Sequence, residues 1–281
     1  MSSIEKAINK LKNHDKAEVI QAPRMSSARV DNEDKSSSRF INLNLAQLRA
    51  SGFVTHDATA TQIVEEYRNI KRPILQNAFG LNAGSVDVGN LVMVTSALPN
   101  EGKTFTSINL AMSIAREREK TVLLVDADVS KAGVSNTLQF EPGLGLSDYL
   151  SDVSLGFDQI IIKTNVPRLA LISAGSRRSD MTELLTSVHM RQFANELSGR
   201  YPDRIILFDS PPLLATSEAK VLAECMGQII MVVEAESTPT HLIQEAISYL
   251  DSSKVIGLVL NKTRAAGKSA YGYGYGYDRE E

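Results

Sequence analysis

From Leu91 onward, apolar runs of strand length alternate with stretches of helical character, and this alternation restricts the possible folds more than any other feature. The strand candidates are Leu91–Thr95, Thr121–Val125, Leu169–Ile172, Arg204–Phe208, Gln228–Val233 and Val255–Leu260. The helix candidates between them are Thr104–Arg118, Met181–Leu197, Ala215–Glu224 and Pro239–Leu250. Continuous apolar strands separated by helices are typical of a parallel sheet covered on both faces. We therefore predict a doubly wound, mostly parallel α/β domain over residues 86–265.

The segments outside this domain have different textures. Residues 1–39 are polar and charged, and we expect a flexible N-terminal segment. Residues 40–85 show apolar positions three or four apart, which predicts a helical oligomerisation or docking segment in which Pro73 limits how far the helix runs unbroken. Residues 266–281 end in YGYGYGYDREE, a composition that cannot form a core, so we predict a disordered, tyrosine-rich C-terminal tail.

Composition excludes several classes of protein. The 281 residues carry a net charge of −3, which gives no electrostatic case for binding nucleic acid. Cys225 is the one cysteine, so no disulfide can form within the chain. No run approaches the ~18 apolar residues of a membrane span, and the charged N-terminus does not have the pattern of a signal peptide. We expect a cytoplasmic protein that reaches a membrane only through a partner.

A phosphate-binding loop follows the first predicted strand. The segment Ser96-Ala-Leu-Pro-Asn-Glu-Gly-Lys-Thr104 lies between that strand and a helix, and it matches the P-loop pattern except that Ala97 replaces the first glycine. Backbone N–H groups of such a loop point at phosphates, a lysine such as Lys103 offers a point charge, and the Thr104 hydroxyl can ligate Mg²⁺. The alternative is a surface loop that contains Gly-Lys-Thr by chance.

Acidic residues follow two further predicted strands. Asp126 and Asp128 come after the run VLLV, and Asp209 ends the run IILF in the manner of a Walker B strand. Ligands of open parallel sheets bind outside the carboxyl ends of the strands, where the P-loop also lies. Each aspartate could instead be an ordinary turn or cap residue, but three such elements in this order favour a Mg²⁺–nucleotide site.

Together these motifs resemble the bacterial tyrosine kinases (BY-kinases), the P-loop autokinases of exopolysaccharide synthesis, and most of all the branch associated with exosortase systems. The resemblance covers about residues 40–281 and rests on SALPNEGKT, LLVDAD, LFDSPP, GLVLNK and the tyrosine-rich end. It implies a P-loop NTPase fold of the ParA/MinD-like type and an ATP-dependent protein-tyrosine autokinase that regulates exopolysaccharide polymerisation and export.

The resemblance also implies roles for residues at matching positions. Lys103, Asp126 and Asp128 would be catalytic, with one of the two aspartates accepting the tyrosine proton. Magnesium would be held by Thr104, Asp126, Asp128 and Asp209. Asn261 lies where the related fold reads the base, and the ATP-binding set is Ala97, Asn100, Glu101, Gly102, Lys103, Thr104, Phe105 and Asn261. The family usually has arginine where this chain has Ser130, followed by Lys131, which leaves the role of that loop open.

Partners are implied in the same way. Glu65, Arg68 and Lys71 resemble the family's E-x-x-R-x-x-R oligomerisation motif, although they could instead form a solvated helix face. Subunits would form a ring-like homo-oligomer in which the phosphoacceptors Tyr271, Tyr273, Tyr275 and Tyr277 of one subunit enter the site of another. A Wzz-like polysaccharide co-polymerase of the inner membrane would activate the kinase and hold it peripherally at that membrane.

Two other classes of protein share parts of this pattern. Partitioning and cell-division ATPases of the ParA/MinD type share the fold and the paired motifs, but they typically carry a signature lysine where this chain has Leu98, and they need no tyrosine tail. A degenerate nucleotide-binding adaptor would not need intact Lys103, Thr104 and Asp209. The tail itself could be a low-complexity end without a role in catalysis.

Overall fold

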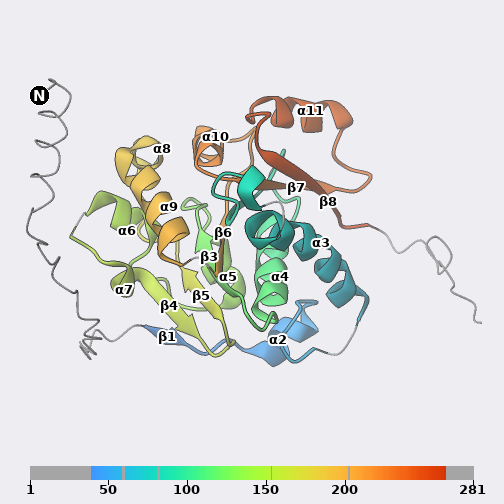
Figure 1. Cartoon of the computed structure of the whole chain (residues 1–281), viewed down its shortest axis with the longest axis horizontal. Coiled ribbons are helices and arrows are strands. Elements are labelled where there is room, and N and C mark those ends of the chain that lie inside the picture. Colours follow the sequence, from blue (N-terminus) through green and yellow to red (C-terminus); the bar gives the residue numbers. More distant parts are fainter. Residues whose placement is uncertain (1–38, 59–60, 81–82, 153, 202, 264–281) are drawn as a thin grey trace, which may run out of the picture. The chain divides into compact units, whose positions relative to one another are not determined.

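The computed structural model describes residues 39–58, 61–80, 83–152, 154–201 and 203–263, which form a central sheet with helices on both sides (Figure 1). The strands are β1 (Phe40–Ile41), β2 (Leu91–Ser96), β3 (Thr121–Asp126), β4 (Ile161–Thr164), β5 (Leu169–Ile172), β6 (Arg204–Asp209), β7 (Gln228–Glu234) and β8 (Val255–Asn261). The helices are α2 (Leu45–Ala50), α3 (Gln62–Phe79), the 3₁₀ turn η1 (Ala83–Ser85), α4 (Lys103–Ala115), α5 (Gly133–Leu138), α6 (Leu146–Ser151), α7 (Phe157–Ile160), α8 (Met181–Thr186), α9 (Val188–Arg200), α10 (Ser217–Glu224) and α11 (Thr240–Ser248).

The sheet has the order β1-β4-β5-β3-β6-β2-β7-β8. Every neighbouring pair from β5 to β8 is parallel, whereas β4 runs antiparallel to β5 and pairs in parallel with β1. This arrangement confirms the predicted doubly wound, mostly parallel sheet. It also places β6 between β3 and β2, so the carboxyl ends of these three strands lie side by side.

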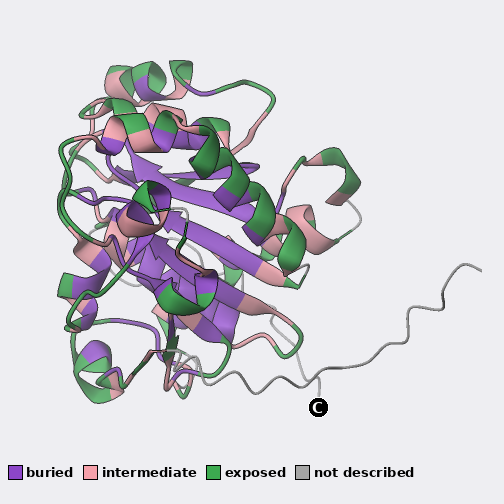
Figure 2. Cartoon of the chain, turned by 90° about the vertical axis from the view of Figure 1, so that its left-hand side faces the viewer, coloured by how far each residue is buried: buried purple, intermediate pink, exposed green. Residues whose placement is uncertain are grey.

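Apolar side chains cover both faces of the sheet. Alternate residues of β2 point to opposite faces, so that Leu91 and Met93 join one buried cluster with residues of α6 to α11, while Val92 and Val94 join a second cluster with residues of α2 to α5. Figure 2 shows the strands buried between helices that are exposed on their outer sides. Burial on both faces explains why β2, β3, β6 and β7 read as continuous apolar runs, whereas the edge strand β8 is partly exposed despite its apolar sequence.

Two observed strands were not predicted, and one predicted helix is divided in the structure. β1 and β4 were not predicted because they are short and β4 ends in the polar residues Lys163 and Thr164. The predicted helix Met181–Leu197 is divided into α8 and α9 at Ser187, whose backbone is extended (ψ 162°) and whose side chain accepts a hydrogen bond from the N–H of Met190. A serine that caps the next helix interrupts an otherwise regular helical pattern.

The helix α3 corrects the expectation for Pro73. Proline removes one backbone hydrogen bond and costs about 3 kcal/mol inside a helix, yet α3 continues through Pro73 for 18 residues. Buried residues lie on both sides of the proline, with Val64, Tyr67 and Lys71 before it and Ile74 after it. The half before Pro73 is held on α4 by Lys71. The half after it is held by hydrogen bonds of Ile74 and Asn77 with Gln228 of β7, so the loss of one hydrogen bond does not end the helix.

The segment before α3 is fixed to the helix that follows the P-loop. The N–H of Val54 donates to Asn109 Oδ1 at 2.7 Å, and the rings of Phe53 and Phe105 lie 4.8 Å apart. The predicted divisions at residues 39, 85 and 265 stay predictions, and the flexible segment (except Arg39) and the tail lie outside the described residues. Among the helices of the described ranges, none combines the length and apolar character needed to cross a membrane.

Candidate functional site

The P-loop joins β2 to α4 and ends at a residue that only glycine suits. Gly102 has φ +96°, and a Cβ at this position would lie 2.0 Å from Nδ2 of Asn261. Lys103 and Thr104 form the first turn of α4, where backbone N–H groups are not yet used by the helix and favour an anion. The backbone therefore forms a cradle of the kind that binds phosphate.

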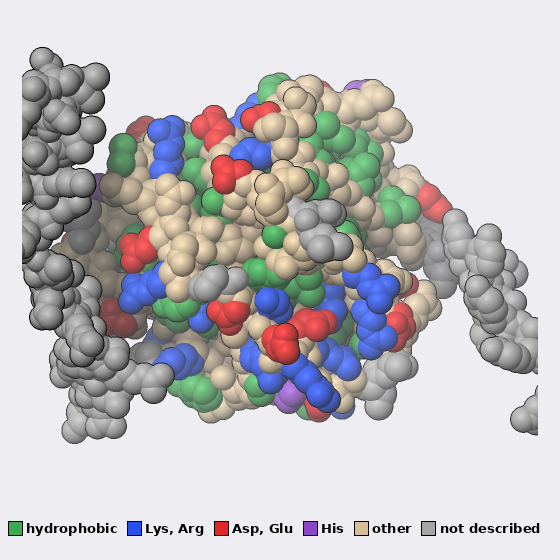
Figure 3. Space-filling model, in the orientation of Figure 1, with side chains coloured by type: hydrophobic (Ala, Val, Ile, Leu, Met, Phe, Trp, Pro, Cys, Tyr) green, Lys and Arg blue, Asp and Glu red, His purple; other side chains and the backbone are tan. Residues whose placement is uncertain are grey.

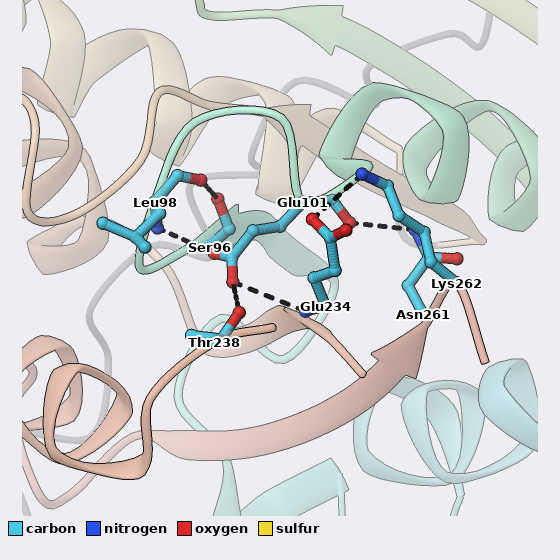
Figure 4. Close-up of polar contacts among 7 residues, drawn as sticks. All are labelled: Ser96, Leu98, Glu101, Glu234, Thr238, Asn261 and Lys262. Atoms are coloured by element: carbon cyan, nitrogen blue, oxygen red, sulfur yellow. Dashed lines mark hydrogen bonds and ion pairs between the residues drawn. The ribbon is translucent and has the colours of Figure 1, made fainter. Parts of the chain in front are cut away.

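The Glu101 side chain ties the loop to the end of β7 and to Thr238, which follows it (Figure 4). Its carboxylate is buried, accepts a hydrogen bond from the N–H of Leu98 at 2.7 Å, and accepts a second from the Thr238 hydroxyl. The N–H of Glu234, at the end of β7, also donates to it at 3.4 Å. Glu101 was predicted to contact ATP. In the structure its carboxylate instead forms hydrogen bonds within the protein that fix the shape of the loop.

The end of β8 contacts the same loop. Asn261 Nδ2 donates to the carbonyl oxygen of Glu101 at 2.9 Å, and Lys262 Nζ pairs with Glu234 at 2.9 Å. Both residues appear beside Glu101 in Figure 4. Asn261 is therefore bonded to the residue before Gly102, and Lys262, the next residue, is tied to the end of β7.

Asp209 joins β6 to the first turns of α4. Its two carboxylate oxygens accept hydrogen bonds from the Thr104 hydroxyl at 2.7 Å and from the Ser107 hydroxyl at 2.9 Å. Ser107 was not predicted as a site residue. The signal that could have found it is its place one helical turn after Lys103, on the face of α4 that points to the strand ends.

Asp126 and Asp128 lie at the adjacent strand end. Asp126 is paired directly with Asp209 in the register of β3 and β6, and it accepts hydrogen bonds from the N–H groups of Val134 and Asp128. Asp128 Oδ1 accepts from the Ser130 hydroxyl at 2.7 Å. Ser130, which stands where the family usually has arginine, thus holds Asp128 in place.

Burial sets the electrostatics of this group. Burial raises the pKa of Asp209 to about 6 and raises that of Asp126 well above its usual range, and the charges of Asp209 and Asp128 raise the pKa of Asp126 further. Burial also lowers the pKa of Lys103, which nearby Asp209 and Asp128 oppose. The single positive charge of Lys103 cannot balance the negative charges of three ionised aspartates in a site with little water. The site therefore favours a bound cation.

The residues fit a magnesium-bound nucleotide. The hydroxyl of Thr104 and the carboxylate of Asp209 are hard oxygen donors, and the P-loop cradle is next to them. Within the described ranges, however, no group of three or more His, Cys, Asp or Glu side chains is close enough to form a metal site by itself. Mg²⁺ in such sites usually keeps water and phosphate oxygens as ligands and is bound by only one or two carboxylates. It therefore does not require direct bonds to all three of the aspartates that were predicted as ligands.

A cavity of about 310 Å³ opens beside Asp128. It is lined by Asp128 and Ser130 on one side and by Arg177, Arg178 and Glu218 on the other. The two arginines were not predicted, and the only signal in the sequence is the dipeptide in a polar loop. The cavity offers space for an acceptor side chain next to Asp128.

In the described part of the chain, the other residues predicted for ATP binding and oligomerisation form no hydrogen bond with the three aspartates. Asn100 is exposed on the P-loop, Ala97 is buried beneath it, and the Phe105 ring packs on Phe53. In the proposed oligomerisation motif, Arg68 is exposed, Glu65 is half-buried, and the two form an ion pair at 2.6 Å. Lys71 is buried within this chain, where its ammonium contacts Ser113 O at 2.8 Å and Glu117 at 2.6 Å. The four tail tyrosines lie outside the described residues.

Comparison with known proteins places the chain in a family. A family model described as "AAA domain" matches residues 100–255. The chain is 33% identical to the tyrosine-protein kinase YwqD of Bacillus subtilis over 211 residues, which cover 74% of this chain and 84% of that protein. It is 30% identical to the tyrosine-protein kinase CpsD of Streptococcus agalactiae over 221 residues, which cover 77% and 91% of the two chains.

A solved structure agrees with these sequence matches. The crystal structure of the VpsO kinase domain superposes with a TM-score of 0.61 and 27% identity, covering 72% of this chain and 96% of that one. The relatives favour the kinase interpretation over a partitioning ATPase. With its P-loop and its acidic strand ends at one edge of a doubly wound sheet, the chain belongs to the bacterial tyrosine-protein kinase family.

Proposed function

We propose that this protein is an ATP-dependent tyrosine autokinase that phosphorylates Tyr271, Tyr273, Tyr275 and Tyr277 of a neighbouring subunit in a ring-like homo-oligomer. The observation that carries the proposal is the contact of Thr104 with Asp209 at 2.7 Å beside Asp126, which brings the P-loop and two acidic strand ends together. Membership in a family of tyrosine-protein kinases and the tyrosine-rich end of the sequence support the choice of acceptor.

Each side chain has a chemical task in this proposal. Lys103 would neutralise charge on the outer phosphates, and Thr104 and Asp209 would hold the magnesium ion. Magnesium supplies charge neutralisation when bound. Asp126, which is buried and accepts hydrogen bonds from backbone N–H groups, would add negative charge beside the metal.

Asp128 is our choice for the proton acceptor, because it lines the cavity in which an acceptor tyrosine would lie. A phenol has a pKa of about 10 and is a weak nucleophile until it loses its proton. The phenol oxygen bonds to the γ-phosphorus, the bond to the bridging oxygen of ADP breaks, and the phenol proton passes to Asp128. Arg177 and Arg178 line the same cavity, and their positive charges would stabilise the negative charge that develops on the acceptor tyrosine.

The setting of the kinase is proposed from the family resemblance. We propose that the protein works in the cytoplasm, is held peripherally at the inner membrane by a Wzz-like polysaccharide co-polymerase, and regulates exopolysaccharide polymerisation and export without binding nucleic acid. Glu65 and Arg68 are on the surface and available for contacts between subunits, whereas Lys71 already has partners inside its own chain.

Incubation of the purified chain with Mg-ATP tests the proposal. Phosphate is expected on residues 271–277 by mass spectrometry, with a higher yield when a peptide from the cytoplasmic part of the membrane partner is added. To test transfer between subunits, an active chain without residues 266–281 is mixed with a Lys103→Ala chain that keeps its tail. Labelled tails on the second chain support transfer in trans, while ATP turnover without phosphotyrosine would contradict the kinase assignment.

A Glu101→Ala substitution is expected to raise the ATP concentration needed for half-maximal autophosphorylation about tenfold, with a smaller effect on the maximal rate. The substitution removes the acceptor of the Leu98 and Thr238 hydrogen bonds, and bonds to a charged group contribute about 1.5–3 kcal/mol each. Initial rates over a range of ATP concentrations measure both quantities. Glu101→Gln should recover most of the loss, and Glu245→Ala on the exposed side of α11 is the matched control. An unchanged ATP dependence in Glu101→Ala would rule out this positioning role.

A further inference from the structure

A second, strongly basic cavity lies at the other end of the helix that begins with the P-loop. It has a volume of about 750 Å³ and is formed by the second half of α3 and by residues 116–120, which follow α4. Since α4 has 13 residues, its ends are about 20 Å apart, so this cavity is separate from the phosphate site. In Figure 3, Lys and Arg side chains gather, with several acidic ones, over the region of α3 and α4.

The charges that line this basic cavity are unbalanced. The acidic lining residues are Glu117 and Glu119, and the cationic ones are Arg68, Lys71, Arg72, Arg116, Arg118 and Lys120. Two of the cations have acidic partners, because Arg68 pairs with Glu65 and Lys71 pairs with Glu117. The cavity therefore has a surplus of positive charge that a dianion would offset.

One guanidinium in the cavity has a donor that the fold does not use. Nη1 of Arg116 is buried and has no hydrogen-bond partner among the residues that the structure describes. Leaving a buried charged donor unpaired is costly, and an anion with several acceptor oxygens would satisfy it. Arginine is suited to this task because its planar donors match the geometry of phosphate oxygens.

The basic cavity also has an aromatic surface. Phe79 and Leu75 line it, and the Lys120 ammonium lies 4.0 Å from the centre of the Phe79 ring. An aromatic ring of a ligand could pack against Phe79 while its phosphate reached the guanidinium groups. The combination fits a phosphate monoester on an aromatic ring better than it fits inorganic phosphate.

We propose that this basic cavity binds phosphotyrosine, and that the occupant is the phosphorylated Gly-Tyr tail of this protein, from the same or a neighbouring copy. The proposal rests on the proposed function for the supply of phosphotyrosine. The tail carries several tyrosines close together, so repeated binding and release would raise its effective concentration at the cavity. Arg68 and Lys71 belong both to the cavity and to the predicted oligomerisation motif, so an occupied cavity would compete with contacts between subunits.

Peptide binding to the full-length chain tests the proposal. The receptor is the Lys103→Ala chain, which keeps its own tail free of phosphate, and the probes are fluorescent peptides of residues 266–281 with and without phosphate on Tyr271 and Tyr273. Fluorescence anisotropy is expected to show at least tenfold tighter binding of the phosphorylated peptide and a marked loss of affinity at high salt. Because the peptides are synthetic, the result does not depend on kinase activity, and equal affinity for both peptides would overturn the proposal.

Substitutions locate the binding. Arg72→Gln combined with Arg116→Gln is expected to reduce the affinity for the phosphopeptide at least tenfold, whereas Arg191→Gln on the exposed surface of α9 should leave it unchanged. Thermal unfolding checks that the double variant is folded, and the single Arg72→Gln variant should give a smaller loss of affinity. Binding that is insensitive to both cavity variants would place the peptide elsewhere. Displacement of the peptide by ADP or inorganic phosphate at lower concentrations than by free phosphotyrosine would overturn the assignment of the tail.

Discussion

Replacing Lys103 by alanine is expected to lower autophosphorylation of the tail by about 10²- to 10³-fold, the size of effect seen when one preorganised charge or donor is removed from a transition state. Lys103 is buried at the start of α4, and the negative charges of nearby Asp209 and Asp128 favour its charged form. In an environment with little water, a fixed cation stabilises developing negative charge much more than it could in solution. Initial rates of phosphotyrosine formation by quantitative mass spectrometry measure the effect.

The matched control for this substitution is Lys163→Ala, which removes an exposed lysine from β4, away from the P-loop. It should change the rate by less than twofold. Both variants are compared at saturating Mg-ATP, so that weaker binding of ATP does not hide an effect on the transfer step. A Lys103→Ala chain that still labels its tail within tenfold of the unaltered rate would show that the phosphate site is not the one assigned.

Replacing Asp209 by asparagine should have opposite effects on stability and on activity. Burial raises the pKa of Asp209 to about 6, so keeping this group ionised at neutral pH costs the nucleotide-free protein on the order of 3 kcal/mol. Asparagine removes that cost. Its Oδ1 can accept a hydrogen bond from one of the Thr104 and Ser107 hydroxyls and its Nδ2 can donate to the other, so thermal unfolding is expected to occur about 5 °C higher. Autophosphorylation should fall at least about 10²-fold, because the substitution removes a proposed ligand of the metal.

The raised pKa of Asp209 also predicts how the free energy of unfolding changes with pH. A carboxyl group whose pKa is higher in the folded state binds more protons there between about pH 4 and 6, so the free energy of unfolding falls as the pH rises through that range. The Asp126 carboxyl acts in the same direction. Without nucleotide and magnesium, the Asp209→Asn chain should show a smaller fall than the unaltered chain, while Asp203→Asn on the exposed surface should not differ from it. A variant that is less stable at pH 7.5 than the unaltered chain would contradict the electrostatic account.

The sheet could be predicted from the sequence because burial on both faces produces continuous apolar runs. β2, β3 and β5 to β8 correspond to predicted runs, and their parallel direction follows from the helices between them. β1 and β4 could not be predicted in this way, since their hydrogen bonds to neighbouring strands, and not their own composition, make them strands. The helix through Pro73 was missed for a similar reason, because contacts with α4 and β7 override local preference.

The site was predictable where a motif requires a particular atom. Gly102, Lys103, Thr104 and Asp209 follow from what a phosphate and its metal need, and the structure brings them together. Residues that hold other residues in place leave no such signal. Ser107 and the carboxylate role of Glu101 depend on contacts across 102 and 137 positions of the chain, which no local pattern can reveal.

The anchoring of residues 261 and 262 beside Glu101 has a consequence for regulation. If the tail is held by another subunit, as we propose, it is joined to the nucleotide loop through Asn261, so docking of the tail would be coupled to binding of the nucleotide. Thermodynamic reciprocity then requires that ATP change the affinity of the tail by the same factor by which the tail changes the affinity for ATP. Through the hydrogen bond at the end of β8, the affinity of each subunit for its nucleotide would thus depend on whether the tail of that subunit is bound by another subunit.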